Sequence, residues 1–141
     1  LVKVGYVSGA CILFTKEVID VMSLFEERYF LYTEDVEFCY RAKKHGLGVF
    51  CNTGCKAVHS SDGSMEMLTR KESRLYYQIR NNVLMSGLFS SRFHRALYRF
   101  FVLLRVFKKS FYFASRLKFS SCKNLFKAYV HGICNVDGQL K

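Results

Sequence analysis

The chain has 141 residues, half of them hydrophobic and 16% aromatic, which is enough to form a sizeable core and excludes an intrinsically disordered chain. Residues 1–70 carry eight Lys or Arg against nine acids, net −1, and residues 71–141 carry fourteen against two, net +12, which together give +11. This asymmetry favours a nucleic-acid or membrane-surface partner for the second half, while the longest uncharged runs, such as 4–15, are too short to span a bilayer.

The first half is expected to combine short strands and helices, and the second half to be helical. Hydrophobic patterns and turn residues predict strands at 7–14, 47–51 and 56–59, and helices at 16–22 and 33–45. After about residue 65 the strand pattern ends, and helices are expected at 70–88, 92–117 and 122–131.

Two acids stand at the start of the helix expected at 33–45. Thr33 is a good N-cap whose hydroxyl can accept a first-turn amide, and Glu34 and Asp35 follow where the helix dipole favours negative charge. Glu37 can pair with Arg41 one turn later. Taken alone, such an acidic pair only stabilises a helix start, by about 0.3–1 kcal/mol for each acid.

The order of the motifs around this pair is more informative than any one of them. In chain order they are GYVSGACILF (5–14), FEE (25–27), YFLYTEDVEFCYR (29–41), GLG (46–48), AVHS (57–60) and GS (63–64). This series resembles the second half of the catalytic domain of family 2 glycosyltransferases, inverting enzymes with a GT-A fold, and in particular their rhamnosyltransferase-like branch. The resemblance covers residues 5–64 and extends more weakly through YYQIRN (76–81).

The resemblance implies an α/β fold in two parts. Residues 1–64 would form the acceptor-side half of a GT-A domain, and residues 65–141 a helical, basic C-terminal extension. The nucleotide-binding half would precede Leu1, so the chain is expected to be an inactive fragment. The implied reaction transfers a sugar from a nucleotide-sugar donor to a polysaccharide or a polyprenyl-linked acceptor, with inversion.

The same resemblance assigns roles to individual residues. Asp35 matches the general base, and Glu34 the first acid of the motif, for which acceptor positioning is the expected role. Ser8, Gly9 and Ala10 would lie against the donor, although small residues there serve equally well for tight packing of a strand on a helix.

A divalent metal, Mn²⁺ or Mg²⁺, is the implied cofactor. His59 matches a position that completes the metal site in several members of the family, whose other ligands come from an Asp-x-Asp motif. This chain has no Asp-x-Asp, so only half of the site is expected here, and a histidine at a strand end can equally be structural.

The six cysteines are expected to be free thiols. Nothing marks the chain as secreted, and no second pair of ligands follows Cys51 and Cys55 at zinc-finger spacing.

The helix expected at 92–117 is basic and amphipathic. On a helical wheel its basic residues fall on one side and its apolar residues on the other: Arg92, Arg95, Arg99, Arg105, Lys109 and Arg116 against Phe93, Leu97, Phe100, Leu104, Phe107 and Phe111. This pattern indicates a helix on an anionic membrane surface, or a helix packed on the core with a solvated basic face.

The expected location is therefore cytoplasmic, at the inner face of the cell membrane. No helix-turn-helix, zinc-finger or RNA-recognition pattern supports a specific nucleic-acid partner. One alternative from another class remains: a non-catalytic membrane-surface or nucleic-acid-binding module in which the acidic pair only caps a helix.

Overall fold

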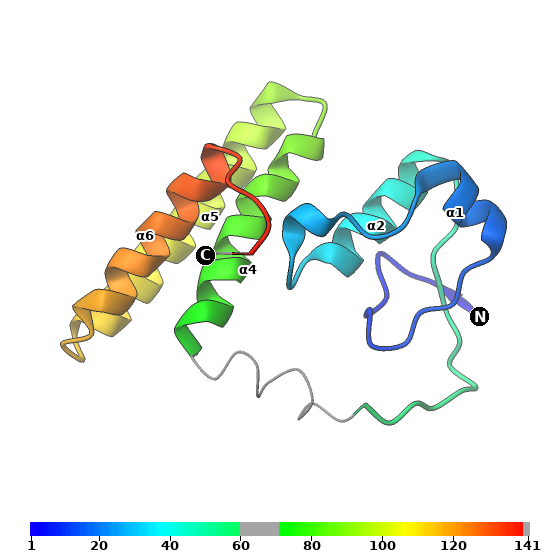
Figure 1. Cartoon of the computed structure of the whole chain (residues 1–141), viewed down its shortest axis with the longest axis horizontal. Coiled ribbons are helices and arrows are strands. Elements are labelled where there is room, and N and C mark those ends of the chain that lie inside the picture. Colours follow the sequence, from blue (N-terminus) through cyan, green and yellow to red (C-terminus); the bar gives the residue numbers. More distant parts are fainter. Residues whose placement is uncertain (60–70, 140–141) are drawn as a thin grey trace.

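The computed structural model describes residues 1–59 and 71–139, and this part of the chain is mostly helical (Figure 1). In chain order its elements are β1 (Val2–Lys3), α1 (Lys16–Met22), the 3-10 helix η1 (Glu27–Tyr29), α2 (Glu34–Lys44), β2 (Phe50–Cys51), α4 (Lys71–Met85), the 3-10 helix η2 (Ser86–Leu88), α5 (Arg92–Ala114) and α6 (Phe119–Ile133). The five helices expected from the sequence are confirmed, each with bounds within about three residues of the prediction.

The strand predictions were less accurate than the helix predictions. Within the described residues the sheet consists of β1 and β2, antiparallel with Val2 opposite Cys51, so only the end of the expected strand at 47–51 is present. The strands expected at 7–14 and 56–59 are wrong, because both segments are irregular. A strand needs a neighbour for its backbone hydrogen bonds, and neither segment pairs with another strand in the described part. Leu13 and Val58 are fully exposed there, at 98% and 102%.

The N-terminal half has its own small hydrophobic cluster, built between α1, α2 and the segment around β2. The rings of Phe14 and Phe25 pack on Phe38 of α2, with centroids 5.2 and 4.8 Å from it. The buried members of this cluster are Met22, Phe38, Cys39, Ala42 and Val49.

The helices α4, α5 and α6 pack side by side as a three-helix unit (Figure 1). Their shared core consists of Tyr76, Tyr77, Ile79 and Val83 of α4, Val102 and Val106 of α5, and Leu125 and Ala128 of α6. A third cluster joins this unit to the N-terminal half: Tyr29 packs with Leu84 and Met85, and Val36 and Tyr40 of α2 pack against them. The start of α2 is therefore set against α4.

The approach of α6 to α4 depends on Gly132. A Cβ placed on Gly132 would lie 2.6 Å from Cβ of Val83 and 2.7 Å from the carbonyl oxygen of Arg80. Real Cβ atoms do not approach so closely, and a backbone oxygen cannot rotate away as a side chain can. The spacing of the two helices at this crossing therefore requires glycine.

We predict that Gly132→Ala lowers the free energy of unfolding by about 1–3 kcal/mol, since the added methyl group must push α6 from α4. The change would be measured by urea denaturation followed by circular dichroism. Gly87→Ala is the matched control, because nothing lies within 4 Å of a Cβ at that position. A Gly132→Ala protein as stable as the control would contradict this account of the crossing.

Candidate functional site

Asp35 lies in the first turn of α2, against the loop that contains Ser8, Gly9 and Ala10. Its Oδ2 accepts the backbone N–H of Gly9 at 3.0 Å, and its Oδ1 accepts the N–H of Val36 at 2.8 Å. A Cβ on Gly9 would lie 3.3 Å from Cβ of Asp35, which is a tight contact. Two motifs 26 residues apart therefore meet here, although the first of them forms a loop and not the expected strand.

Glu34 differs from its neighbour in being partly withdrawn from water. Its Oε2 is buried and has no hydrogen-bond partner among residues 1–59 and 71–139. Burial raises the pKa of Glu34 above its ordinary value, a backbone hydrogen bond partly offsets this, and the charge of Asp35 raises the pKa further. Glu34 is thus poised to hold a proton more readily than an exposed glutamate does.

The loop that leads into α2 adopts a backbone that side chains disfavour. Phe30, Tyr32 and Thr33 have φ of 57°, 66° and 77°, in the left-handed region, and none of them is glycine. Each such residue costs about 1–2 kcal/mol. The expected cap is also wrong: Thr33 precedes α2 but its side chain makes no capping hydrogen bond. Capping side chains normally stand on an extended backbone, which Thr33 lacks.

Arg80 and Asn81 of α4 hold this loop through its carbonyl groups. The amide nitrogen of Asn81 lies 2.8, 2.7 and 2.6 Å from the carbonyl oxygens of Tyr29, Leu31 and Tyr32. The guanidinium of Arg80 donates to the same Tyr29 carbonyl at 3.0 Å. Both side chains are completely buried. The two N–H groups of Asn81 are thus shared among three carbonyl oxygens, and together with the bond from Arg80 they fix the turn that carries the acidic pair.

Arg80 also forms a hydrogen bond with the C-terminal segment. Its Nη1 donates to the carbonyl of Gly138 at 2.6 Å, and its Nε donates to Oδ1 of Asn81 at 2.9 Å. The guanidinium carbon lies 4.8 Å from the ring centre of Tyr77, which is cation–π distance. Burial lowers the pKa of Arg80 below its ordinary value, with the neighbouring tyrosines acting against that shift.

Sequence reasoning missed the role of Arg80 and Asn81, which entered only as the end of the YYQIRN motif. A signal was present: both residues follow Tyr76 and Tyr77 by four positions and so share their helix face. Because that face is apolar and aromatic, an Arg-Asn pair on it predicts a buried polar network.

A second polar group fixes the middle of α2. Glu37, which is 1% exposed, and Arg41 form the expected pair, with two contacts of 2.9 and 3.0 Å between guanidinium and carboxylate. Arg41 also donates to the carbonyl of Met22, the last residue of α1, and to that of Leu24. The pair therefore joins α1 to α2 and holds the acid-bearing helix from its other side.

His59 is exposed, and residues 60–70, which follow it, lie outside the described residues, as does the end of the resemblance at Gly63 and Ser64. Among residues 1–59 and 71–139, no three His, Cys, Asp or Glu side chains come close enough to hold a metal ion. The described residues therefore do not fit a divalent metal site by themselves. All six cysteines are free, as expected.

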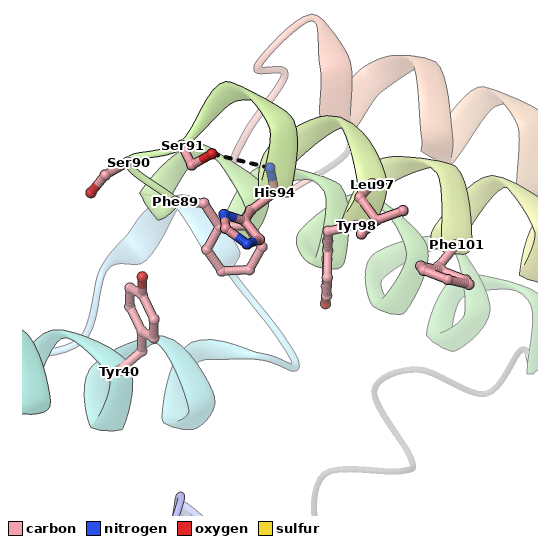
Figure 2. Close-up of a pocket in the computed structure, with 8 residues that line it drawn as sticks. All are labelled: Tyr40, Phe89, Ser90, Ser91, His94, Leu97, Tyr98 and Phe101. Atoms are coloured by element: carbon pink, nitrogen blue, oxygen red, sulfur yellow. Dashed lines mark hydrogen bonds between the residues drawn. The ribbon is translucent and has the colours of Figure 1, made fainter.

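An apolar hollow of about 520 Å³ lies between α2 and α5 (Figure 2). Tyr40 of α2 faces it from one side, and the start of α5 forms the other. Its lining residues are Tyr40, Phe89, Ser90, Ser91, His94, Leu97, Tyr98 and Phe101. Tyr40 follows Asp35 by five residues, about 7.5 Å along the helix axis, so the hollow and the acidic pair share one short helix.

Comparison with known proteins gives a partial match. Over 101 residues the chain is 30% identical to a Haloferax volcanii protein named low-salt glycan biosynthesis hexosyltransferase Agl10. The match covers 70% of this chain and 32% of that protein, so the chain spans about a third of the length of the curated relative it matches. No family model and no solved structure matches the chain. The similarity supports a relationship to glycosyltransferases.

We predict that Asn81→Asp lowers the free energy of unfolding by about 2–4 kcal/mol, because a buried acceptor would then face three carbonyl oxygens. Urea denaturation would measure the loss. The control is Asn82→Asp, whose Oδ1 still accepts the Tyr98 hydroxyl and whose amide bonds only the Gln78 carbonyl. If both variants lose the same stability, Asn81 does not hold the loop in the way described.

Glu34→Gln should stabilise the chain at neutral pH. Folding raises the pKa of this carboxyl, so its contribution to the free energy of unfolding is fully present only below the unfolded pKa of about 4.3. As the pH rises through the raised pKa of the folded state, the carboxyl ionises in its partly buried site and that contribution is lost. The difference in unfolding free energy between variant and parent should therefore be near zero at acidic pH and grow toward pH 7. The exposed Glu27→Gln is the control. A difference that stays constant with pH would refute the assignment.

Proposed function

We propose that this chain is the acceptor-side part of an inverting glycosyltransferase of family 2, with a GT-A fold of α/β class and closest in character to the rhamnosyltransferase-like branch. The observation that carries the proposal is the contact of Asp35 with Gly9, since the two motifs that the family resemblance assigns to one site are adjacent. The match to a protein named as a hexosyltransferase supports the broader class. In this proposal residues 1–64 belong to the catalytic domain and residues 65–141 form a helical extension.

Asp35 acts as general base in the proposed reaction. It removes the proton of an acceptor hydroxyl while that oxygen attacks C1 of the donor sugar, and the bond from C1 to the nucleoside diphosphate breaks on the opposite side. Each carboxylate oxygen can accept two hydrogen bonds, so the bonds from Gly9 and Val36 leave acceptor capacity on both. Those bonds also fix the carboxylate, which lowers the cost of orienting it for proton transfer.

Glu34 positions the acceptor in this proposal. Its carboxyl precedes the base by one residue, so it can hydrogen-bond an acceptor hydroxyl beside Asp35, and burial raises its pKa above the ordinary value. Ser8, Gly9 and Ala10 supply an open backbone segment next to the base, where a sugar can approach closely.

The metal and the donor have less support from the described residues. His59 would be one ligand of a divalent ion and the remaining ligands would come from outside residues 1–59 and 71–139, so no step is assigned to a metal. Because the chain spans 32% of its relative's length, we expect the 141-residue chain alone to be inactive.

We predict that Asp35→Asn in the active protein lowers kcat by about 10²-fold or more, since the amide keeps the shape but cannot take the proton. Turnover of a nucleotide-sugar with a glycan or polyprenyl-linked acceptor would be measured, with product configuration at C1 read by NMR. Glu34→Gln is expected to act mainly on KM for the acceptor.

The control is Asp20→Asn, the same change at an exposed acid of α1. Near-normal turnover of Asp35→Asn would show that Asp35 is not the general base. A product with retained configuration at C1 would contradict the inverting mechanism.

A further inference from the structure

The basic amphipathic helix α5 is oriented opposite to the usual arrangement of a surface helix. Its buried residues are Val102, Val106 and Ser110, a narrow stripe of small side chains. The large apolar residues lie on the far side and are exposed by 40–80%: Phe93, Leu97, Phe100, Leu104, Phe107 and Phe111. We call these six residues the apolar face. The alternative expectation, a helix packed by its apolar side with a solvated basic side, is therefore wrong.

The basic residues of the opposite side are partly used inside the molecule. Arg95 donates to the carbonyl of Phe89 at 2.9 Å, and Arg99 donates to the hydroxyl of Ser86 at 2.8 Å. Lys109 is half-buried, and burial, then Arg105 and Arg74, lower its pKa. The bonds of Arg95 and Arg99 to Phe89 and η2 explain why α5 turns these two arginines inward and leaves the apolar face outward.

The helix α6 extends the apolar face. The ring of Phe126 packs on Phe107 with centroids 5.3 Å apart and is itself 37% exposed. The residues that α6 buries are again mostly small: Ser121, Leu125, Ala128 and Gly132. Both α5 and α6 therefore direct large apolar side chains to the surface, as helices that lie in a membrane interface do.

The charge around the apolar face has one sign. Residues 92–133 contain ten Lys or Arg and no Asp or Glu. Exposed members of this set stand on both helices and on the turn between them: Arg105, Lys108, Arg116, Lys118, Lys123 and Lys127. A second copy of the chain would bring like charges together, whereas an anionic partner would be attracted. Of the anionic partners, nucleic acid uses cations and stacked rings but has no use for Leu97 and Leu104, which a bilayer takes up.

We propose that α5 and α6 bind the surface of an anionic lipid bilayer, with the apolar face inserted at the headgroup boundary and the lysines against the headgroups. None of the described helices is long and apolar enough to cross a membrane. The hollow between α2 and α5 shares Leu97 with the apolar face and gives an acyl chain a place to lodge (Figure 2). The anionic leaflet of a cell membrane is the cytoplasmic one, so the protein would act there.

The proposal is tested on the 141-residue chain by flotation with two vesicle types, pure phosphatidylcholine and phosphatidylcholine mixed with phosphatidylglycerol. Binding should be much stronger to the anionic vesicles, and raised salt should weaken it without abolishing it, because salt screens the charges but not the apolar contact. The combined variant Phe100→Ser, Leu104→Ser and Phe107→Ser should lose at least about tenfold in vesicle affinity.

Two variants serve as controls. The first makes the same kind of change at exposed apolar residues outside α5 and α6, with Leu13→Ser, Val21→Ser and Val58→Ser, and should leave affinity within about twofold. The second, Phe93→Ser with Phe111→Ser, targets the two most exposed members of the apolar face, at 71% and 80%, and should lower affinity even if the triple variant folds poorly. Circular dichroism would check helix content in each case.

Charge is tested separately. Replacing Lys108, Lys123 and Lys127 with Gln should lower affinity for anionic vesicles by about tenfold or more and reduce the salt dependence, whereas the same change at Lys3, Lys16 and Lys56 should not. Failure to bind either vesicle type would overturn the proposal. So would duplex DNA binding that exceeds vesicle binding and is insensitive to the serine variants, or a dimer in sedimentation that those variants dissociate. These outcomes do not depend on the proposed sugar transfer.

Discussion

The carbonyl groups of Tyr29, Leu31 and Tyr32 converge before the start of α2, and the position of that helix depends on the donors that satisfy them. The backbone there passes through three left-handed residues without a glycine, so the turn does not form by local preference. Buried carbonyls that lack donors would cost about 1–3 kcal/mol each. Asn81 and Arg80 supply those donors from a different helix, and the turn is therefore stable only when α4 is in place.

This constraint links the two halves of the chain. Arg80 bonds residues on the N-terminal side at Tyr29 and on the C-terminal side at Gly138, while Gly132 lets α6 approach the Arg80 carbonyl. On its other side α2 is joined to α1 by the pair of Glu37 and Arg41. The acidic pair thus sits at the start of a helix held by two guanidinium groups, that of the buried Arg80 on the preceding loop and that of the partly buried Arg41 on the helix itself. A general base benefits from such support because its orientation need not be established in each catalytic cycle.

The helices could be predicted because their signal is local: apolar periodicity, capping residues and glycines occur within the segment itself. The strands could not, since residues 7–14 have strand composition but pair with no neighbour in the described part, and pairing is a property of the rest of the sheet. The pair of Glu37 and Arg41 followed from helical spacing alone. The contact of Gly9 with Asp35 spans 26 residues, and only the family resemblance placed the two motifs together. The bonds from Asn81 to the loop span about 50 residues and leave no local pattern.

The orientation of α5 shows why a helical wheel gives two faces but not which of them is buried. The wheel separates the arginines from the phenylalanines, but which of the two sides is buried depends on the contacts that the neighbouring elements can make. Here Ser86 of η2 and Phe89, which follows η2, offer oxygen acceptors, so Arg95 and Arg99 can turn inward with hydrogen bonds that compensate for lost hydration. Val102 and Val106 fill the rest of the buried contact, with Tyr98 and Phe113 packed against the same cluster. The phenylalanines are therefore exposed to water, and burying their surface would be favourable by about 25 cal/mol for each square ångström. A bilayer covers it without displacing the inward contacts, so membrane binding and the internal packing of α5 favour the same orientation.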